Sequence, residues 1–378
     1  MTGREKIESA FSADGTAEIP VAICYEGILV RDHWEELTSH PWWYRHTMDI
    51  EPQMQWRRDM AARVPQDWIQ VPPCSGREQR KLWELDVRSD GVFWIDKRTG
   101  KERELKRPAV AGWHGAGDLH SIRPERLIET VEEIDDKVPV PADFDADAFR
   151  AQGRDELARR IEREFPDRFL VSSTGSPLWR CYPVWGFEGM MMMVAERPDL
   201  VEHACRRALP GLMNRVREGA ACGAQGIWIE ECFTDMVSPE AFRRLGLPFV
   251  RAITDEIRSL GMRSIYYFCG DPAGKWDMLL DAGADALALE ETKKSFVIGI
   301  DEVADHVAGR GTILGNLDSV GVLQDGTEAQ LRAEIERQIA AGRRNGSRFI
   351  MGLGSPVTPS TSIDRVRLFC DLVHELGS

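Results

Sequence analysis

Short apolar runs alternate with longer stretches of helical periodicity through the C-terminal two thirds of the chain. Most runs are rich in β-branched or bulky residues, and a polar or glycine-bearing turn follows each of them. Strands that are apolar throughout and are separated by helices are typical of a parallel sheet covered on both faces. The repeated unit therefore predicts an α/β fold, a TIM-type (β/α)₈ barrel. The predicted strands are Phe169–Ser173, Gly226–Glu230, Ser264–Cys269, Ala286–Glu290, Thr312–Leu314 and Arg348–Gly352.

Capping signals mark several helices between these strands. Ser238 followed by Pro239 is typical of a helix start, with serine as the N-cap and proline at the first helical position. Pro248 predicts a break within or beside that helix. A capping box opens the helix predicted over Thr327–Ala341, and Ser362–Leu376 is predicted to be a final amphipathic helix.

The N-terminal third has a less regular pattern. Pro20–Glu26 and Asp67–Val71 are predicted to be two further strands, and Leu85–Leu105 an antiparallel excursion, because glycine-containing turns flank its β-rich run. Arg123–Asp147 is acidic and contains prolines, so it is predicted to be a surface connection. Because the sequence shows no repeat and no low-complexity tract, we expect a single domain over residues 1–378.

Composition and charge narrow the classes of function. Hydrophobic residues make up 43% of the 378 residues, which is sufficient for a large buried core. The formal net charge of −14 repels nucleic-acid phosphates and anionic membranes, so we expect no nucleic-acid partner and no membrane partner. No run approaches the roughly 18 apolar residues of a membrane span, and no apolar signal core follows the first residues, so we expect a cytoplasmic protein. The eight scattered cysteines are then expected to be free thiols.

Acidic side chains dominate the expected strand ends, where barrel enzymes place their active sites. Several carboxylates in one cavity cannot all ionise cheaply without a cation or shared protons. The pattern therefore indicates a metal, a cationic substrate group or acid–base chemistry, while the alternative is that individual acids point outward and cap helices. The strand-end candidates are Tyr25, Glu26, Ser173, Thr174, Glu230, Glu231, Cys232, Tyr267, Cys269, Asp271, Glu290, Glu291, Asn316, Asp318, Gly354 and Ser355.

Cys269 and Glu290 form the sharpest pair, because they end two consecutive predicted strands and both a thiolate and a carboxylate bind zinc. Zinc normally takes three or four protein ligands, and Glu231, Cys232 or Tyr267 would complete the set without diagnostic spacing. Aromatic residues also gather near the N-terminus, where they either pack in the core or form an apolar or cation-binding wall. They are Tyr25, Trp34, Trp42, Trp43 and Tyr44.

Several segments occur in an order that resembles a known superfamily. They are Gly3–Ile7, Gly226–Glu231, Tyr267–Asp271, Gly283–Ala286, Gly315–Asp318 and Gly352–Pro356. This order is similar to that of the uroporphyrinogen decarboxylase superfamily, most firmly from about residue 165 onward, and the GNLD segment at Gly315–Asp318 is the most specific of them. The resemblance implies a barrel enzyme.

Two departures bear on the branch of that superfamily. Its true decarboxylases carry an arginine-rich segment after the first strand and a Ser-Asp pair after the next, where this chain has Cys24–Gly27 and Val71–Cys74. A site without those cations would bind an octacarboxylate porphyrinogen poorly. The resemblance therefore favours the branch of cobalamin-dependent methyltransferases, similar to methylcobalamin:coenzyme M methyltransferase.

That branch holds zinc through a His-x-Cys pair, a downstream acid and a late cysteine. Cys269 and Glu290 match two of these positions, and the resemblance implies them as metal ligands. Tyr267 stands in place of the histidine and Leu353 in place of the late cysteine, so the zinc set is incomplete. Asp118 and His120 match the start of a cobalamin-binding Asp-x-His-x-x-Gly signature, but Arg123 stands in place of its glycine. Methylcobalamin or another corrinoid is therefore expected on a separate corrinoid-binding protein.

We therefore expect a methyltransferase that moves a methyl group between a small methylated substrate and that corrinoid protein. Glu231, Tyr267 and Glu290 are the expected catalytic residues. Two alternatives stay open: a decarboxylase or other lyase that acts on a smaller carboxylic acid, and a non-catalytic subunit that binds a corrinoid partner. The expected substrate-binding residues are Tyr25, Glu26, Asn316, Asp318 and Ser355.

Overall fold

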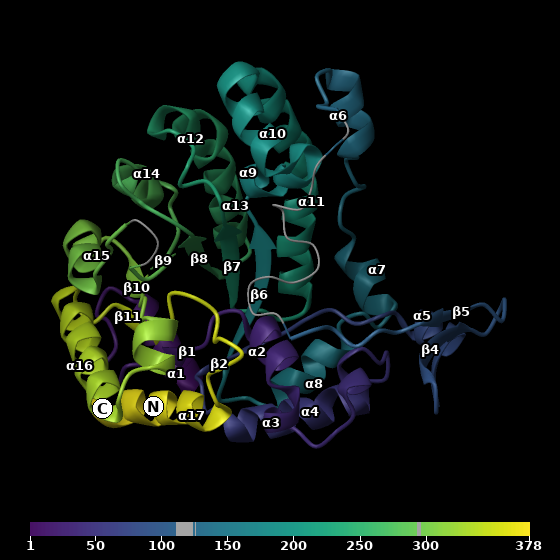
Figure 1. Cartoon of the computed structure of the whole chain (residues 1–378), viewed down its shortest axis with the longest axis horizontal. Helices are drawn as coiled ribbons and strands as arrows, with labels where there is room; N and C mark the ends of the chain where they lie inside the picture. Colours follow the sequence, from purple (N-terminus) through teal and green to yellow (C-terminus); the bar gives the residue numbers. More distant parts are fainter. Residues whose placement is uncertain (111–123, 125, 293–295) are drawn as a thin grey trace.

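The computed structural model describes residues 1–110, 124, 126–292 and 296–378. Within them, eight parallel strands form one sheet that curves into the predicted TIM-type barrel, with helices around it (Figure 1). The strand order, β1-β11-β10-β9-β8-β7-β6-β2, brings the first and last strands of the chain side by side. The strands are β1 (Val21–Ala22), β2 (Trp68–Gln70), β6 (Phe169–Gly175), β7 (Gly226–Glu231), β8 (Arg263–Phe268), β9 (Ala286–Leu289), β10 (Thr312–Leu314) and β11 (Phe349–Gly352).

The barrel closes between β1 and β2 through the two residues that precede β2. The backbone N–H of Asp67 donates to the carbonyl of Val21 at 2.7 Å, and the Asp67 carboxylate accepts from the N–H of Val21 at 2.7 Å. The side-chain oxygen of Gln66 accepts from the N–H of Ile23 at 2.9 Å. We call these three contacts the seam. Two of them are hydrogen bonds from backbone N–H groups to side-chain oxygens, where two ordinary neighbouring strands would pair through backbone carbonyls.

Helices follow the strands and cover the outside of the sheet. They are α1 (Gly3–Phe11), α2 (Glu26–Asp32), α3 (Trp34–Leu37), η1 (Trp42–Arg45), α4 (Ile50–Arg63), α5 (Arg77–Leu82), α6 (Val131–Lys137), α7 (Ala146–Ala151), α8 (Glu156–Glu164), α9 (Pro177–Arg180), α10 (Tyr182–Glu196), α11 (Pro198–Ala221), α12 (Pro239–Leu245), α13 (Leu247–Ser259), α14 (Trp276–Asp281), α15 (Ile300–Val307), the π-helical η3 (Ser319–Gln324), α16 (Glu328–Arg344) and α17 (Ile363–Leu376).

The capping signals that were read from the sequence are confirmed. The Ser238 hydroxyl accepts from the N–H of Ala241 at the start of α12, and the predicted break near Pro248 lies between α12 and α13. Thr327 and Gln330 form the capping box of α16. Ser362 caps α17 through the N–H of Arg365.

The predicted antiparallel excursion is a three-stranded sheet that projects from one side of the barrel (Figure 1). Its strands are β3 (Trp83–Arg88), β4 (Gly91–Asp96) and β5 (Glu102–Glu104). The predicted connection over Arg123–Asp147 is wrong in part, because a capping box of Thr130 and Glu133 starts α6 within it. Residues 111–123 and 125, which include the segment compared with a cobalamin signature, lie outside the described part.

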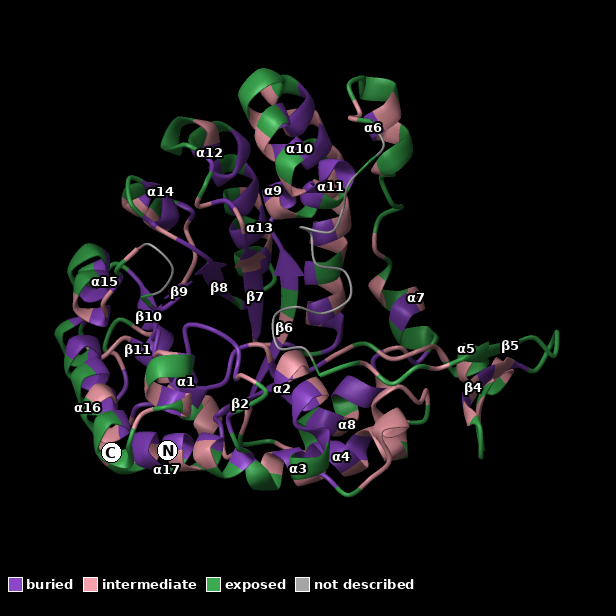
Figure 2. Cartoon of the chain, in the orientation of Figure 1, coloured by how far each residue is buried: buried purple, intermediate pink, exposed green. Residues whose placement is uncertain are grey.

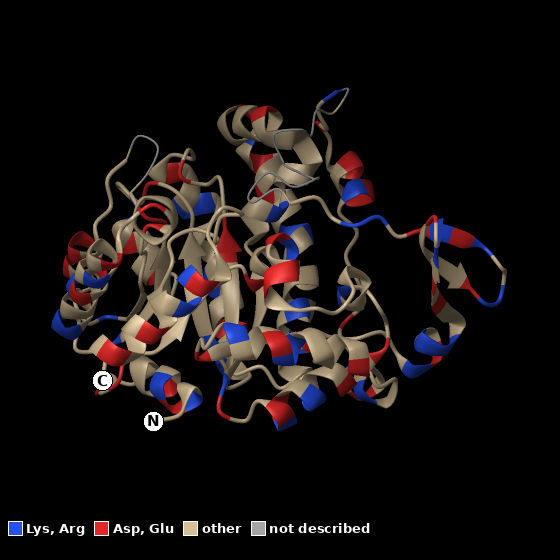
Figure 3. Cartoon of the chain, turned by 60° about the horizontal axis from the view of Figure 1, so that its bottom comes forward, with Lys and Arg blue, Asp and Glu red and all other residues tan. Residues whose placement is uncertain are grey.

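The predicted first strand is also shorter than expected. Only Val21–Ala22 pairs with β11, and α2 begins at Glu26 because Tyr25 takes a left-handed conformation with a φ of 56°. The strands of the barrel are largely buried and the outer faces of the helices are exposed (Figure 2). Acidic and basic residues are interspersed along the helices (Figure 3). Among the described residues, no helix has the length and apolar character needed to cross a membrane.

Candidate active site

The C-terminal ends of β7 and β8 meet Tyr25, the residue that precedes α2, at one end of the barrel. Side chains alternate along a strand, so Trp228 and Glu230 lie on the same face of β7, and Tyr267 of β8 is in register with Glu230. We use the name mouth cluster for the buried or half-buried group gathered there. It consists of Tyr25, Trp228, Glu230, Cys232, Tyr267 and Cys269.

Three aromatic rings form a wall in this cluster. The rings of Trp228 and Tyr267 are stacked, with centroids 5.0 Å apart, and Tyr25 meets each of them edge-on. The Tyr267 hydroxyl donates to the carbonyl of Gly354 at 2.8 Å, which ties this ring to the segment after β11. The small Ala288 of β9 is in register with Tyr267. The wall therefore fills much of the barrel end with rigid apolar surface.

Glu230 is the acid that faces this wall. The Tyr25 hydroxyl donates to its carboxylate at 3.2 Å, and the Cys232 thiol donates to the same oxygen at 3.4 Å. Burial raises the pKa of Glu230, an effect that these two hydrogen bonds and the Arg180 charge partly offset. The Cys269 thiol beside Cys232 and burial together raise the pKa of Cys232 well above its usual value. Burial in this apolar environment therefore favours the neutral forms of the Glu230 carboxyl group and the Cys232 thiol.

Glu231 lies on the opposite face of β7. Its carboxylate accepts from the hydroxyl of Tyr266 at 3.2 Å, and its side chain is wholly buried. Burial raises the pKa of Glu231 to about 7, although hydrogen bonds from Ser176 and Tyr266 oppose the shift. The structure thus separates Glu231 from the wall where the sequence placed it together with Tyr267.

The remaining predicted residues line the strand ends from β9 to β11. Glu290 is buried, and its charge contributes to the raised pKa of Tyr267, for which burial is the main cause. The amide of Asn316 donates to the backbone carbonyl of Glu290 at 3.1 Å. The Ser355 hydroxyl donates to Glu291 at 2.6 Å. Asp318 instead caps η3, since its carboxylate accepts from two N–H groups of that turn.

Glu26 faces a different hollow from the mouth cluster. Its carboxylate accepts from the Gln66 amide at 3.2 Å, and it lines a cavity of about 380 Å³ together with Arg45 and Arg57. The segment Pro73–Ser75 separates this cavity from a neighbouring one of about 780 Å³.

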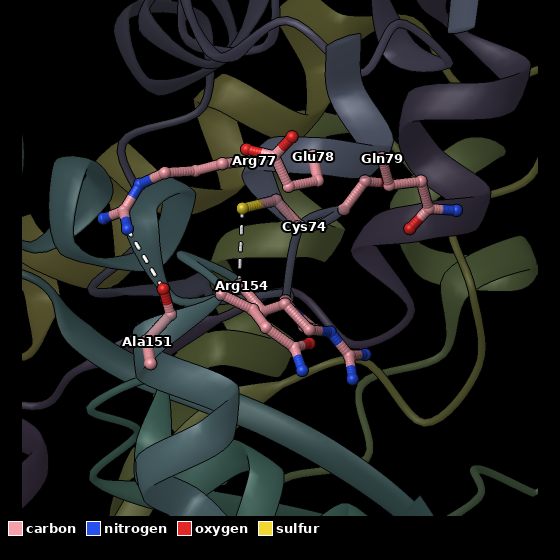
Figure 4. A pocket seen from close by; sticks show the side chains of 10 residues that line it. Cys74, Arg77, Glu78, Gln79, Ala151 and Arg154 are labelled. Carbon is pink, nitrogen blue, oxygen red and sulfur yellow. Dashed lines mark hydrogen bonds between the residues drawn. The ribbon is translucent and has the colours of Figure 1, made fainter. Parts of the chain in front are cut away.

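The neighbouring cavity is shown in Figure 4. There the Cys74 thiol donates to the carbonyl of Arg154 at 3.3 Å, and Arg77 donates to the carbonyl of Ala151 at 3.1 Å. Both side chains are thus held by backbone carbonyls at its edge.

Comparison with known proteins finds a family for this chain. The family described as uroporphyrinogen decarboxylase (URO-D) matches residues 122–376, which include β6 to β11 and the acids at their ends. The chain belongs to the uroporphyrinogen decarboxylase family. Strands β7 and β8 and the residue after each, which make up most of the mouth cluster, lie within the matched residues.

Individual relatives bear different names. Uroporphyrinogen decarboxylase of Neisseria meningitidis serogroup C is 27% identical over 217 residues, which cover 55% of this chain and 59% of that relative. Uroporphyrinogen decarboxylase of Herminiimonas arsenicoxydans is 27% identical over 308 residues, 77% of this chain and 75% of that protein. A methyltransferase from Methanosarcina mazei matches with a TM-score of 0.66 and 17% identity over the full length of both chains, which shows the barrel fold.

The zinc set expected of the methyltransferase branch does not fit the residues at this site. In the described part of the chain, no three side chains of His, Cys, Asp or Glu are grouped so that they could hold a metal ion. Tyr267 directs its hydroxyl to a backbone carbonyl, and Leu353 is a buried apolar residue. Cys269 and Glu290 thus lack the further ligands that a zinc ion takes.

Sequence reasoning missed three residues of functional interest, Trp228, Arg45 and Arg57, and it named Glu230 as a strand-end candidate without a catalytic role. Glu230 and Trp228 share the face of β7 opposite to Glu231, and the alternation of the strand could have revealed this once Tyr267 was taken as inward. Arg45 and Arg57 lie far from any strand end in sequence. No local pattern distinguishes them from ordinary surface arginines.

Proposed function

We propose that this member of the family is a methyltransferase, which passes a methyl group between a small methylated substrate and a corrinoid held by a separate protein. The observation that carries the proposal is the Glu230 carboxyl group, which is half-buried beside the aromatic wall and hydrogen-bonded by Tyr25 and Cys232. A neutral acid in that position can protonate the heteroatom that loses its methyl group.

The residues of the mouth cluster would divide this work. Trp228 and Tyr267, which are buried and stacked on each other, would exclude water from the Glu230 carboxyl group and give a small substrate an apolar boundary. Tyr25 orients the Glu230 carboxyl group through its hydroxyl. When bound, the corrinoid supplies a nucleophilic cobalt centre that accepts the methyl group. As the bond between methyl and heteroatom breaks, Glu230 would deliver its proton to the departing heteroatom.

The size of the wall supports a small substrate. Trp228 and Tyr267 occupy the barrel end, and Tyr25 packs edge-on against both. A large tetrapyrrole with eight carboxylates would need that space and a matching set of cations. This supports methyl transfer over porphyrinogen decarboxylation.

The proposal can be tested with free cob(I)alamin as the methyl acceptor and a panel of methylated phenols, amines and thiols. Formation of methylcobalamin is followed by its absorbance. Glu230→Gln should lower turnover by about a hundredfold or more, because the amide cannot donate the carboxyl proton. Glu240→Gln, an exposed acid in α12, is the matched control and should leave turnover unchanged. Full turnover in Glu230→Gln would remove this acid from the mechanism.

A decarboxylase or lyase acting on a smaller acid is the second candidate. Arg180 at the end of α9 lies close enough to Glu230 to affect its pKa, and a guanidinium there could hold a substrate carboxylate. The names of the Neisseria and Herminiimonas relatives also favour this chemistry for the family. Release of CO₂ from a small acid without any cob(I)alamin requirement would replace methyl transfer as the proposed reaction.

A further inference from the structure

The cavity of about 380 Å³ beside β2 lies outside the mouth cluster. It is enclosed by α2, η1, α4 and the segment after β2, with Leu157 of α8 at one side. Val30, Ile50, Trp56 and Leu157 give it an apolar lining. A hollow of this size with an apolar wall suits a small organic ligand.

Two arginines add positive charge to this lining. Arg57 is 7% exposed, and its Nη1 donates to the backbone and side-chain oxygens of Gln53 at 2.7 and 2.6 Å. Its Nε and Nη2 make no hydrogen bond to any residue that the structure describes. Arg45 donates through Nη2 to the carbonyl of Gly27 at 2.9 Å and is half-buried. Arg57 lines the cavity, and neither its Nε nor its Nη2 is among the fully buried atoms without a partner, so a ligand in the cavity can accept from both side by side.

Glu26 does not neutralise this charge by direct contact. It is 4% exposed and hydrogen-bonded by the Gln66 amide, and within the described ranges it forms no ion pair shorter than 4.0 Å with either arginine. Burial lowers the pKa of Arg57 to about 10; the Glu26 charge opposes this shift and the Arg45 charge adds to it. Burial and the same Arg45 charge lower the pKa of the neighbouring His46. The cavity therefore has a positive potential that an anion would relieve.

We propose that this cavity binds a small organic carboxylate with an apolar body, held by Nε and Nη2 of Arg57 and by Arg45. A planar carboxylate matches two adjacent donors of one guanidinium. Trp56 and Ile50 would cover the apolar part of the ligand. The nearby Glu26 disfavours a doubly charged phosphate. The inference concerns binding alone and stands whether or not the chain transfers methyl groups.

Isothermal titration calorimetry of the full chain tests the site with benzoate, acetate and inorganic phosphate as probes. Benzoate should bind with one site per chain, acetate more weakly because it lacks the apolar body, and phosphate without measurable heat. Arg57→Met and Arg45→Gln should each weaken benzoate binding about tenfold, the expected loss of a charge-assisted hydrogen bond. Arg63→Gln, an exposed arginine on the same helix α4, is the matched control and should bind as the parent chain does.

Two results would overturn the proposal. One is the absence of benzoate binding to the parent chain, and the other is binding that survives both arginine variants unchanged. Phosphate binding tighter than benzoate would overturn the carboxylate assignment. Because Arg57 is buried, Arg57→Met needs a circular dichroism spectrum, and if it fails to fold the half-buried Arg45→Gln decides the question alone.

Discussion

Glu230 and Glu231 are neighbours in β7 whose carboxyl groups lie on opposite faces of the sheet. Glu230 meets Tyr25 and Cys232 in the mouth cluster, and Glu231 meets Tyr266 on the other face. Both acids are buried enough for the pKa to rise, but only Glu230 lies beside the aromatic wall. We therefore expect Glu231 to affect the stability of the fold, and Glu230 to take part in the proposed reaction.

Glu231 predicts a specific dependence of stability on pH. Its pKa is about 7 in the folded chain, against an ordinary value of 4.5. Between these values the folded state binds more protons than the unfolded state, so the free energy of unfolding falls as pH rises through this window. Glu231→Gln cannot ionise, so at pH 8 it should recover stability on the order of 3 kcal/mol relative to the parent.

Chemical denaturation at pH 5 and pH 8 measures this difference. The gain of Glu231→Gln over the parent should be small at pH 5 and larger at pH 8. Glu240→Gln, exposed in α12, should show no such trend. An equal offset at both pH values would mean that Glu231 stays ionised when folded, contrary to the raised pKa.

The sequence predicted acids at the strand ends but not which of them face the barrel interior. Hydrophobic residues occupy both faces of β7, as in Ile227, Trp228 and Ile229, so apolar character does not distinguish inside from outside. Register with Tyr267 settles the matter for Glu230. The burial of Arg57 depends on the packing of α4 against η1 and α8, which no local pattern shows.

At the scale of elements, helix caps were the most predictable features. The capping box of α16 joins the Thr327 hydroxyl to the N–H of Gln330, and the Gln330 side chain to the N–H of Thr327. Thr327→Ala should lower the free energy of unfolding by about 1 kcal/mol, since it leaves the N–H of Gln330 without its acceptor. Thr327→Ser keeps the hydroxyl and should stay within a few tenths of the parent in urea denaturation.

One capping signal was overlooked, in the segment Arg123–Asp147, whose acidic and proline-bearing composition had been taken to indicate a connection. Thr130 and Glu133 form a capping box in an acidic, proline-bearing stretch, and α6 begins there. The first strand was predicted too long because its apolar run continues to Tyr25, whose left-handed backbone is a tertiary feature. By contrast, the predicted Thr312–Leu314 strand matches β10 in both bounds, since a helix and a glycine delimit it.

For the molecule as a whole, the seam is the feature on which closure of the barrel depends. Asp67 accepts from the N–H of Val21 and from His374 of α17, and its own N–H donates to Val21. Asp67→Ala should lower the free energy of unfolding by about 2 kcal/mol or more, because a buried N–H loses its acceptor.

Urea denaturation followed by tryptophan fluorescence measures this loss. Asp281→Ala is the matched control: it removes an exposed aspartate at the end of α14 and should change stability little. An Asp67→Ala chain as stable as the parent would mean that the remaining seam contacts, from the N–H of residue 67 and the side chain of Gln66, suffice to close the barrel.

The barrel was predicted from the alternation of strands and helices, because a parallel sheet buries both of its faces only when helices or other strands cover them. The seam was not, because it rests on the side chains of Gln66 and Asp67, whose role depends on a strand more than forty residues earlier in the chain. Periodicity predicts which segments are strands. It carries no information about how the first and last members of a closed sheet meet.

The strand order has a consequence for how the chain folds while it is being made. The ladder partner of β1 is β11, so Val21 and Ala22 must wait until Met351 and Gly352 have left the ribosome. Until then the nascent barrel is an open sheet with two unpaired edges, which is the state most prone to association with other chains. His374, which reaches Asp67 from α17, emerges later still. The barrel can therefore close only after translation has passed β11, and the contact of Asp67 with α17 forms only after His374 has emerged.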